Sequence, residues 1–336
     1  MFLTTLQQVA ILLIFIFIGY FFKKKNIITD GGRKVLAALL VNLFAPAYSI
    51  TSLSAVVNVK DITQCALLLL VGAVVAAVLV FVAMPFAKLL GKDKFHQNIY
   101  NYAFAFGNIG YFGYPLIYGV FGEVARAQMM LFCLPMSMVI YSYGYYILTR
   151  PTDQLSVQNL KSQNKKSMAK RLSFLYNPPL IGAYIGIVLG LLQSGVGFEI
   201  PKFFNDLFIA AGNCQSVPAM LITGSVLAGV PFKKLFTSWK PYVIGVIRLL
   251  VFPLIFSLLI LIVYLIGWRN QTFMQIAFIS LVSVSMPVGM NVVVYPESVG
   301  ADSTEGAKTC FISYVLALIT IPIIFSIALN VLGVSF

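Results

Sequence analysis

The stretch GNIGYFGYPL, residues 107–116, lies in the middle of an apolar segment and decides the fold. Three glycines, an asparagine and a proline in one membrane span do not fit an unbroken helix, because glycine and proline each weaken the backbone hydrogen-bond ladder. A second such stretch, SMPVGMN at residues 285–291, lies at the corresponding place in the second half of the chain. The sequence therefore predicts two helices interrupted at mid-membrane, where unwound backbone must be buried in protein or line a cavity.

The composition is that of an integral membrane protein. Of the 336 residues, 60% are hydrophobic and only 10% are charged, and the mean hydropathy is +0.93. Soluble domains carry roughly 25% charged residues. The net charge of +13 does not indicate nucleic acid as a partner, because the basic residues lie in short loops between apolar runs. The expected surroundings are a lipid bilayer.

Windows of about 20 residues without charge predict helices that cross the bilayer. The segment 1–22 lacks the basic start and cleavage site of a signal peptide, so we expect it to be a retained first helix. A tenth window, 241–268, is interrupted only by Arg248. The nine charge-free windows are 1–22, 35–59, 62–87, 97–122, 127–149, 172–198, 207–232, 270–296 and 309–336.

The basic residues predict the orientation, because Lys and Arg concentrate in cytoplasmic loops. One alternate set of loops carries 18 of them, whereas the other carries only Lys60, Arg126, Lys202 and Arg269. We therefore expect a multi-pass protein of the plasma (inner) membrane with both termini outside. The basic run 150–173 is interpreted as a cytosolic linker, with a lipid-headgroup or regulatory contact as the alternative. It separates two five-span halves, 1–149 and 174–336, whose odd span number predicts an inverted repeat.

The two breaks predict an anion site. We expect the fourth span to end its first half near Phe106 and to start its second near Pro115, and the ninth to restart near Pro287. Both new half-helices would then begin near the midplane and present free N–H groups and positive dipole ends. Asn108 and Asn291 add amides that donate to a carboxylate; capping of the broken ends is the alternative role for them.

Other residues near the breaks have weaker assignments. Gly110 belongs to the first break, and Tyr111 and Tyr114 are candidates for a cavity wall, with ordinary packing as the alternative. Arg248 is interpreted either as a carboxylate partner in the cavity or as a side chain that snorkels to the cytosolic interface. His96, the single histidine, is expected to be solvated or to cap a helix.

Several kinds of chemistry are excluded by what the spans lack. None of the ten windows contains Asp or Glu, so exchange of protons or sodium through paired intramembrane carboxylates is not expected. The spans contain no HExxH motif, no paired aspartates, and no serine with a histidine, so we do not expect an enzyme. We expect no cofactor and no metal, because the four cysteines, all within spans, show no metal-ligand spacing: Cys65, Cys133, Cys214 and Cys310.

The sequence resembles the auxin efflux carrier family, which includes plant auxin exporters and bacterial carriers linked to malate or malonate. The likeness spans the whole chain and is carried by GNIGYFGYPL, by Met286-Pro287 followed by Asn291, and by TCFISYVLALITIP at 309–322. The resemblance implies an inverted five-plus-five fold related to bile-acid symporters and sodium/proton antiporters, with crossed broken helices. It also implies an elevator-like movement and a homodimer formed through the second and seventh spans.

By the same resemblance, Asn108, Pro115, Pro287 and Asn291 correspond to residues at the helix crossing. The third span lacks the acid that some relatives place there, so proton coupling through that span is not expected. The predicted function is secondary transport of a small organic anion, such as malate, malonate or an auxin-like acid. The alternative is a membrane sensor that binds such an anion without moving it.

Overall fold

The computed structural model describes residues 2–58, 62–149, 178–231, 236–267, 270–298 and 303–332, with the single residues 233 and 301. The regular structure of these residues is helical, apart from one isolated bridge between two extended residues. The prediction of an all-helical protein is therefore confirmed. The predicted linker, residues 150–173, lies outside the described residues.

The described helices include four five-residue π-helical turns, labelled η, each joined to α-helix. In the first half the elements are α1 (Phe2–Lys24), α2 (Asp30–Leu39), η1 (Leu40–Phe44), α3 (Ala45–Val56), α4 (Ile62–Leu90), α5 (Lys94–Ala105), η3 (Ile109–Gly113), α6 (Tyr114–Val139), η4 (Ile140–Gly144) and α7 (Tyr145–Thr149). In the second half they are α9 (Pro178–Val196), α10 (Lys202–Asn213), α11 (Ser216–Leu227), α13 (Lys240–Val246), η7 (Ile247–Val251), α14 (Phe252–Leu265), α15 (Gln271–Val284), α16 (Asn291–Ser298) and α17 (Thr304–Leu332).

Six helical runs among the described residues are long and apolar enough to cross a membrane. Two further apolar helices, Leu180–Val196 and Gln271–Val284, are shorter. The chain is thus a multi-pass helical membrane protein, while the number of ten spans stays a prediction. The six runs are Phe2–Lys24, Ile62–Leu90, Tyr114–Thr149, Lys202–Leu227, Lys240–Leu265 and Thr304–Asn330.

Three of the π-helical turns accommodate prolines. Pro46, Pro115 and Pro253 each occupy the second position of the α-helix that follows η1, η3 or η7. A proline ring crowds the carbonyl four residues before it, and here that carbonyl always lies in the wider π turn, which leaves room for the ring. The helix consequently runs through Pro115. The expectation that the second half-helix starts there is wrong, because it starts at Ile109.

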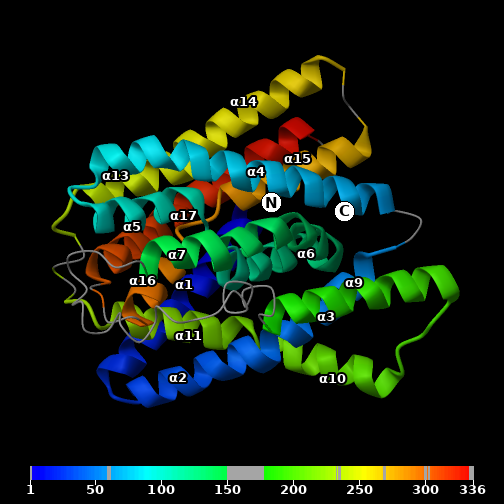
Figure 1. Ribbon diagram of the computed structural model, residues 1–336, viewed down its shortest axis with the longest axis horizontal. Helices are drawn as coiled ribbons and strands as arrows, with labels where there is room; N and C mark the ends of the chain where they lie inside the picture. Colours follow the sequence, from blue (N-terminus) through cyan, green and yellow to red (C-terminus); the bar gives the residue numbers. More distant parts are fainter. Residues whose placement is uncertain are drawn as a thin grey trace, which may run out of the picture.

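Helices α1, α2, α3, α9, α10 and α11 form one bundle, and most of them lie along the lower side of the molecule in Figure 1. Within it, α1 packs along α11, and α3 packs along α9. Glycines let the backbones touch: a Cβ at Gly224 would collide with the Ile16 carbonyl, and a Cβ at Gly182 would lie 2.6 Å from the Pro46 carbonyl oxygen. We name this group the α3/α9 bundle.

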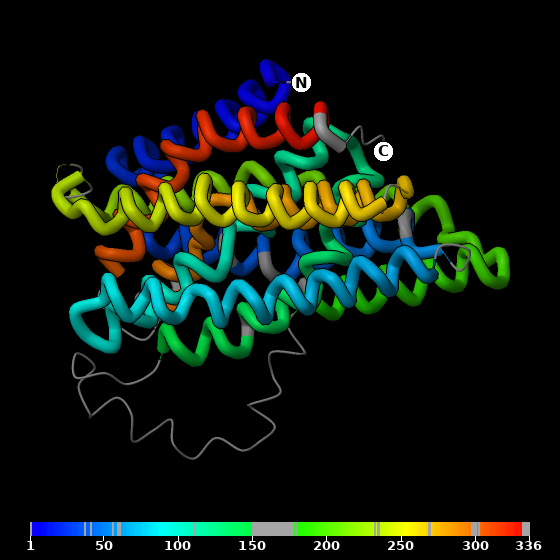
Figure 2. The backbone as a smooth tube through the Cα atoms, turned by 90° about the horizontal axis from the view of Figure 1, so that it is seen from above, coloured from blue at the N-terminus to red at the C-terminus, as the bar shows by residue number. Residues whose placement is uncertain are grey.

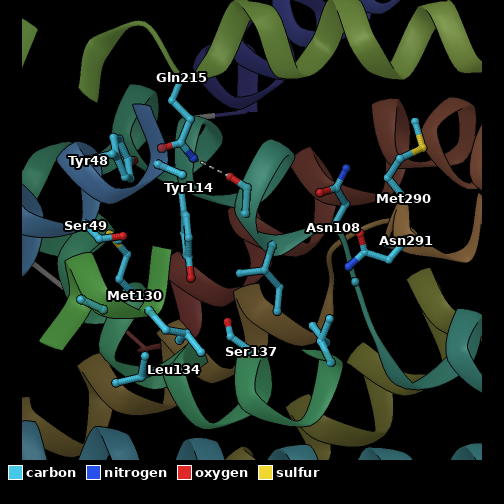
Figure 3. A pocket seen from close by; sticks show the side chains of 18 of the residues that line it. Tyr48, Ser49, Asn108, Tyr114, Met130, Leu134, Ser137, Gln215, Met290 and Asn291 are labelled. Carbon is cyan, nitrogen blue, oxygen red and sulfur yellow. Dashed lines mark hydrogen bonds between the residues drawn. The ribbon is translucent and has the colours of Figure 1, made fainter. Parts of the chain in front are cut away.

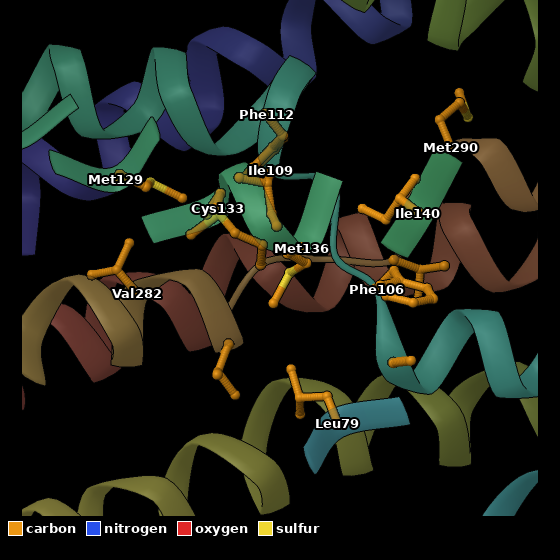
Figure 4. Packing of buried hydrophobic residues seen from close by; sticks show 14 of the residues in the cluster. Leu79, Phe106, Ile109, Phe112, Met129, Cys133, Met136, Ile140, Val282 and Met290 are labelled. Atoms are coloured by element: carbon orange, nitrogen blue, oxygen red, sulfur yellow. The ribbon is translucent and has the colours of Figure 1, made fainter. Parts of the chain in front are cut away.

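The remaining helices form a second group, which we name the crossing bundle because it contains both breaks. Here α4 packs against α5 and α6, α13 against α17, and α15 against α4 and α6. Figure 4 shows its buried core, in which Leu79 of α4, Cys133 of α6 and Val282 of α15 belong to the same cluster as Phe106 and Ile109 of the first break. The two bundles meet where α3 contacts α6 and where α1 lies beside α17 (Figure 2).

The residues just before α5 stabilise the start of the first broken helix. Asp93 caps α5, because the His96 backbone N–H donates to Asp93 Oδ1 at 2.9 Å, and His96 Nδ1 lies 2.8 Å from both carboxylate oxygens. Burial raises the pKa of Asp93, but the hydrogen bonds and charge of His96 outweigh it and hold that pKa below its usual value. His96 therefore sits at the helix start, as its sequence position predicts.

The close contact of α1 with α11 is tested by Gly224→Ala. The added methyl group would meet the backbone carbonyl of Ile16, which cannot rotate away, so we expect a loss of about 1–3 kcal/mol. The measurement is the thermal unfolding midpoint of the purified protein in detergent. Gly31→Ala is the control, since the nearest atom to its Cβ would be the Thr29 hydroxyl at 3.9 Å. Equal midpoints for both variants would contradict this account.

Candidate functional site

The two helix breaks cross each other and are joined by backbone hydrogen bonds. Gly107 and Val288 form an antiparallel bridge. Beside it, the Asn108 N–H donates to the Pro287 carbonyl at 2.6 Å, and the Gly289 N–H donates to the Phe106 carbonyl at 3.0 Å. Each break thus provides hydrogen-bond partners for backbone N–H and C=O groups that the other break leaves unpaired. Such partners are required at membrane depth, where these groups have no water to bind.

Glycine is needed at this crossing because the chains approach so closely. A Cβ on Gly289 would lie 3.2 Å from the Gly107 carbonyl oxygen and 3.3 Å from that of Phe106. A Cβ on Gly107 would lie 2.6 Å from Arg248 Nη2 and 2.8 Å from Met286 Cβ. Close packing therefore accounts for one glycine of each sequence motif, Gly107 and Gly289.

Helix α17 fixes the crossing from one side. Asn108 Nδ2 donates to the Tyr314 hydroxyl at 2.9 Å, and the Val288 N–H donates to Ser313 Oγ at 3.1 Å. The Tyr314 ring stacks on Phe112 with centroids 5.9 Å apart. The Asn108 amide is thus held in place by a buried neighbour.

Arg248 is fully buried at the crossing. Its Nε donates to the Met286 carbonyl at 3.1 Å, and its Nη1 donates to the Phe104 carbonyl. Phe104 lies in the last turn of α5, and Met286 follows the last residue of α15 by two positions, so both carbonyls are at C-terminal helix ends. The interpretation that Arg248 snorkels to the interface is therefore wrong, because the side chain is buried and donates to backbone carbonyls.

The position of Arg248 decides the electrostatics of the crossing. Two broken helices bring together two C-terminal ends, which carry partial negative charge, and two N-terminal ends, which carry partial positive charge. The guanidinium binds carbonyls at the C-terminal ends, so it offsets the negative pair. The N-terminal ends of η3 and α16 then leave the crossing with a net positive character, which suits an anion.

A cavity of about 120 Å³ lies beside the crossing. Figure 3 shows Asn108, Met290 and Asn291 on one side of it and Tyr48, Ser49 and Gln215 on another. Its walls come from both bundles, and no Asp or Glu is among the described residues that line it. From the α3/α9 bundle these are Ala45, Tyr48, Ser49, Leu53, Leu180, Ala183 and Gln215; from the crossing bundle they are Tyr102, Gly107, Asn108, Ile109, Gly110, Tyr114, Met130, Leu134, Ser137, Ile140, Gly289, Met290 and Asn291.

The structure brings four of the predicted residues to this cavity: Asn108, Gly110, Tyr114 and Asn291. Pro287 belongs to the crossing through its carbonyl, but its side chain is not part of the cavity wall, and Pro115 lies further along the helix. The Tyr111 side chain is outside the described set. Arg248 also does not line the cavity.

Several wall residues were missed by the sequence analysis. Tyr48 and Ser49 follow Pro46 in the second predicted span, and Gln215 is a polar residue in the seventh. Polar residues inside a span are the signal that could have found Ser49 and Gln215. The approach of α3 and α11 to the crossing depends on packing between bundles, which no local pattern shows.

These features define a class: a multi-pass helical membrane protein with two broken helices that meet beside a cavity. A family model described as "Membrane transport protein" matches residues 4–325, and the chain belongs to this family. The predicted membership of the auxin efflux carrier family is thereby confirmed.

Two relatives are named as transporters. An uncharacterized transporter of Methanothermobacter thermautotrophicus is 21% identical over 324 residues, which cover 96% of this chain and 98% of that protein. An uncharacterized transporter of Methanocaldococcus jannaschii is 25% identical over 203 residues, which cover 59% of this chain and 61% of that protein. The prediction of a membrane transport protein is thus confirmed.

Two glycines of the first motif are expected to differ in their response to alanine. Gly107→Ala places a methyl group against Arg248 and Met286 and should cost about 1–3 kcal/mol of stability. Gly110→Ala meets no atom within 4 Å, so the unfolding midpoint should not fall. That methyl group instead occupies cavity space and should weaken ligand binding about tenfold or more. Thermal unfolding and binding of malonate and malate measure both effects; a destabilised Gly110→Ala protein would contradict this division.

The backbone role of Arg248 predicts the behaviour of Arg248→Met. The variant leaves two buried carbonyls without a donor, and hydrogen bonds from charged groups contribute about 1.5–3 kcal/mol each. We expect a lower unfolding midpoint and an equal loss of affinity for monocarboxylates and dicarboxylates. A loss confined to dicarboxylates would show instead that the guanidinium contacts the ligand.

Proposed function

We propose that this protein is a secondary active transporter of a small organic anion, held at the crossing of its two broken helices. The observation that carries the proposal is the cavity, where the N-terminal ends of η3 and α16 meet the amides of Asn108 and Asn291. No acidic side chain among the described wall residues competes for positive charge. A carboxylate is the anion that such a set of N–H donors favours.

The size of the cavity supports a narrower substrate class. Its volume of about 120 Å³ is close to the roughly 150 Å³ of an engineered cavity that accepts benzene. A short-chain carboxylate such as malate or malonate suits this space better than a bicyclic auxin-like acid. The apolar part of the wall, with Tyr48, Tyr114 and Leu134, would then cover the carbon skeleton.

The bundle arrangement supports an elevator-type movement. The cavity lies between the α3/α9 bundle and the crossing bundle, so sliding of one bundle along the other would carry the bound anion across the membrane. If the two halves are inverted repeats of five spans, the first and second spans correspond to the sixth and seventh. The glycine contact of α1 with α11 then corresponds to the glycine contact of α9 with α3. The ten spans, with crossed fourth and ninth spans, are part of this proposal.

The remaining elements of the proposal concern the membrane. The loops rich in Lys and Arg would face the cytosol, with both termini outside the plasma membrane. A homodimer would form through the second and seventh spans, which correspond to α2–α3 and α10–α11. These helices expose apolar side chains such as Leu43, Phe203 and Leu207, which a second copy or lipid would cover.

Asn108→Asp tests the proposal. The change preserves the shape of the side chain and lets the Tyr314 hydroxyl donate to it in place of accepting from it, but it adds a negative charge to the cavity wall. Because a like charge costs several kcal/mol, we expect malonate and malate uptake into proteoliposomes to fall by tenfold or more. Asn205→Asp adds the same charge on α10, away from the cavity, and should leave uptake unchanged.

The same assay separates transport from sensing. Binding of an acid without flux under any imposed gradient would favour the sensor over the carrier. Undiminished uptake by the Asn108→Asp protein would contradict the placement of the anion at the crossing.

A further inference from the structure

Gln215 is the polar side chain by which the α3/α9 bundle reaches the crossing. It stands in the short turn between α10 and α11, at the start of α11. The side chain is 4% exposed, lines the cavity, and directs its Nε2 to the Gly110 carbonyl at 3.5 Å (Figure 3). Gly110 has open space on its side-chain face.

The amide oxygen of Gln215 receives no hydrogen bond among the described residues, although it is fully buried. The amide cannot satisfy this oxygen by turning over, because the oxygen would then face the Gly110 carbonyl, another acceptor. A buried acceptor without a donor costs about 1–3 kcal/mol. Gln215 lines the cavity, so a donor group bound there is the candidate partner for this oxygen.

We propose that Gln215 accepts a hydrogen bond from a hydroxyl or amino group of the substrate. This proposal rests on the proposed function and narrows it: the preferred anion is a carboxylate that also carries a hydrogen-bond donor, as malate and other 2-hydroxy acids do and malonate does not. Gln215 is then a specificity-determining residue. The carboxylate lies at the N-terminal ends of the half-helices, and the donor points across the cavity to the α3/α9 bundle.

The two contacts differ in what they select. The half-helix ends and the asparagine amides attract any carboxylate, because they respond to negative charge. The Gln215 oxygen discriminates, because an acid without a donor fills the cavity and leaves the oxygen unpaired. Sites that hydrogen-bond a substrate hydroxyl reject the analogue without it by large factors. We expect at least tenfold discrimination, which corresponds to about 1.4 kcal/mol.

The test compares acids that differ only by one hydroxyl group. Lactate is paired with propionate and malate with succinate, and each is measured for binding and for uptake in proteoliposomes of the full-length protein. The variant is Gln215→Met, which keeps the length of the side chain and removes the acceptor. The control is Gln193→Met on α9, since the Gln193 oxygen also finds no partner in the part of the chain that the structure describes, but the residue is not part of the cavity wall.

The expected result is a preference of tenfold or more for the hydroxy acid of each pair in the wild-type protein and in Gln193→Met. In Gln215→Met the two acids of each pair should bind about equally, because the acceptor is gone, and binding of propionate and succinate should be retained. A wild-type protein that binds both acids of each pair equally overturns the role of Gln215 and leaves the proposed transport of carboxylates standing. A wild-type protein that binds and moves none of the four acids overturns both.

Discussion

The structure depends on the antiparallel backbone pairing of the two helix breaks. In a bilayer, the N–H and C=O groups released when a helix is interrupted have no water to bind, so an isolated break would be unstable. Here Asn108 and Gly289 donate to carbonyls of the opposite break, and each interruption satisfies the other. The pairing brings the backbones so close that a Cβ at position 289 would crowd two carbonyl oxygens, and one at position 107 would collide with Arg248 and Met286.

The pairing has an electrostatic consequence that explains the buried arginine. Crossing two broken helices places four helix ends within one small volume, and the negative ends would cancel the field of the positive ones. Arg248 binds the carbonyls of Phe104 and Met286 and occupies the negative side. The positive ends remain available on the cavity side, where Asn108 and Asn291 lie. An uncharged residue at position 248 would not create this asymmetry.

Local sequence patterns locate both breaks, but they place the restart of the first broken helix six residues too late. Pro115 suggests a helix start, whereas the π turn η3 gives the proline ring room and the helix begins at Ile109. Asn108, Gly110 and Asn291 are also predictable, because polar and small residues inside apolar spans are visible locally. The role of Arg248 is not, since the carbonyls that bind it come from positions 104 and 286.

The sequence by itself determined the helical membrane fold, the positions of the two interruptions and the family. These follow from local hydropathy and from the backbone chemistry of glycine and proline, which act over a few residues. Only the tertiary structure decided that Tyr48, Ser49 and Gln215 complete the cavity and that Arg248 faces the backbone. The reason is that these contacts join residues far apart in the chain, and they depend on how the two bundles pack.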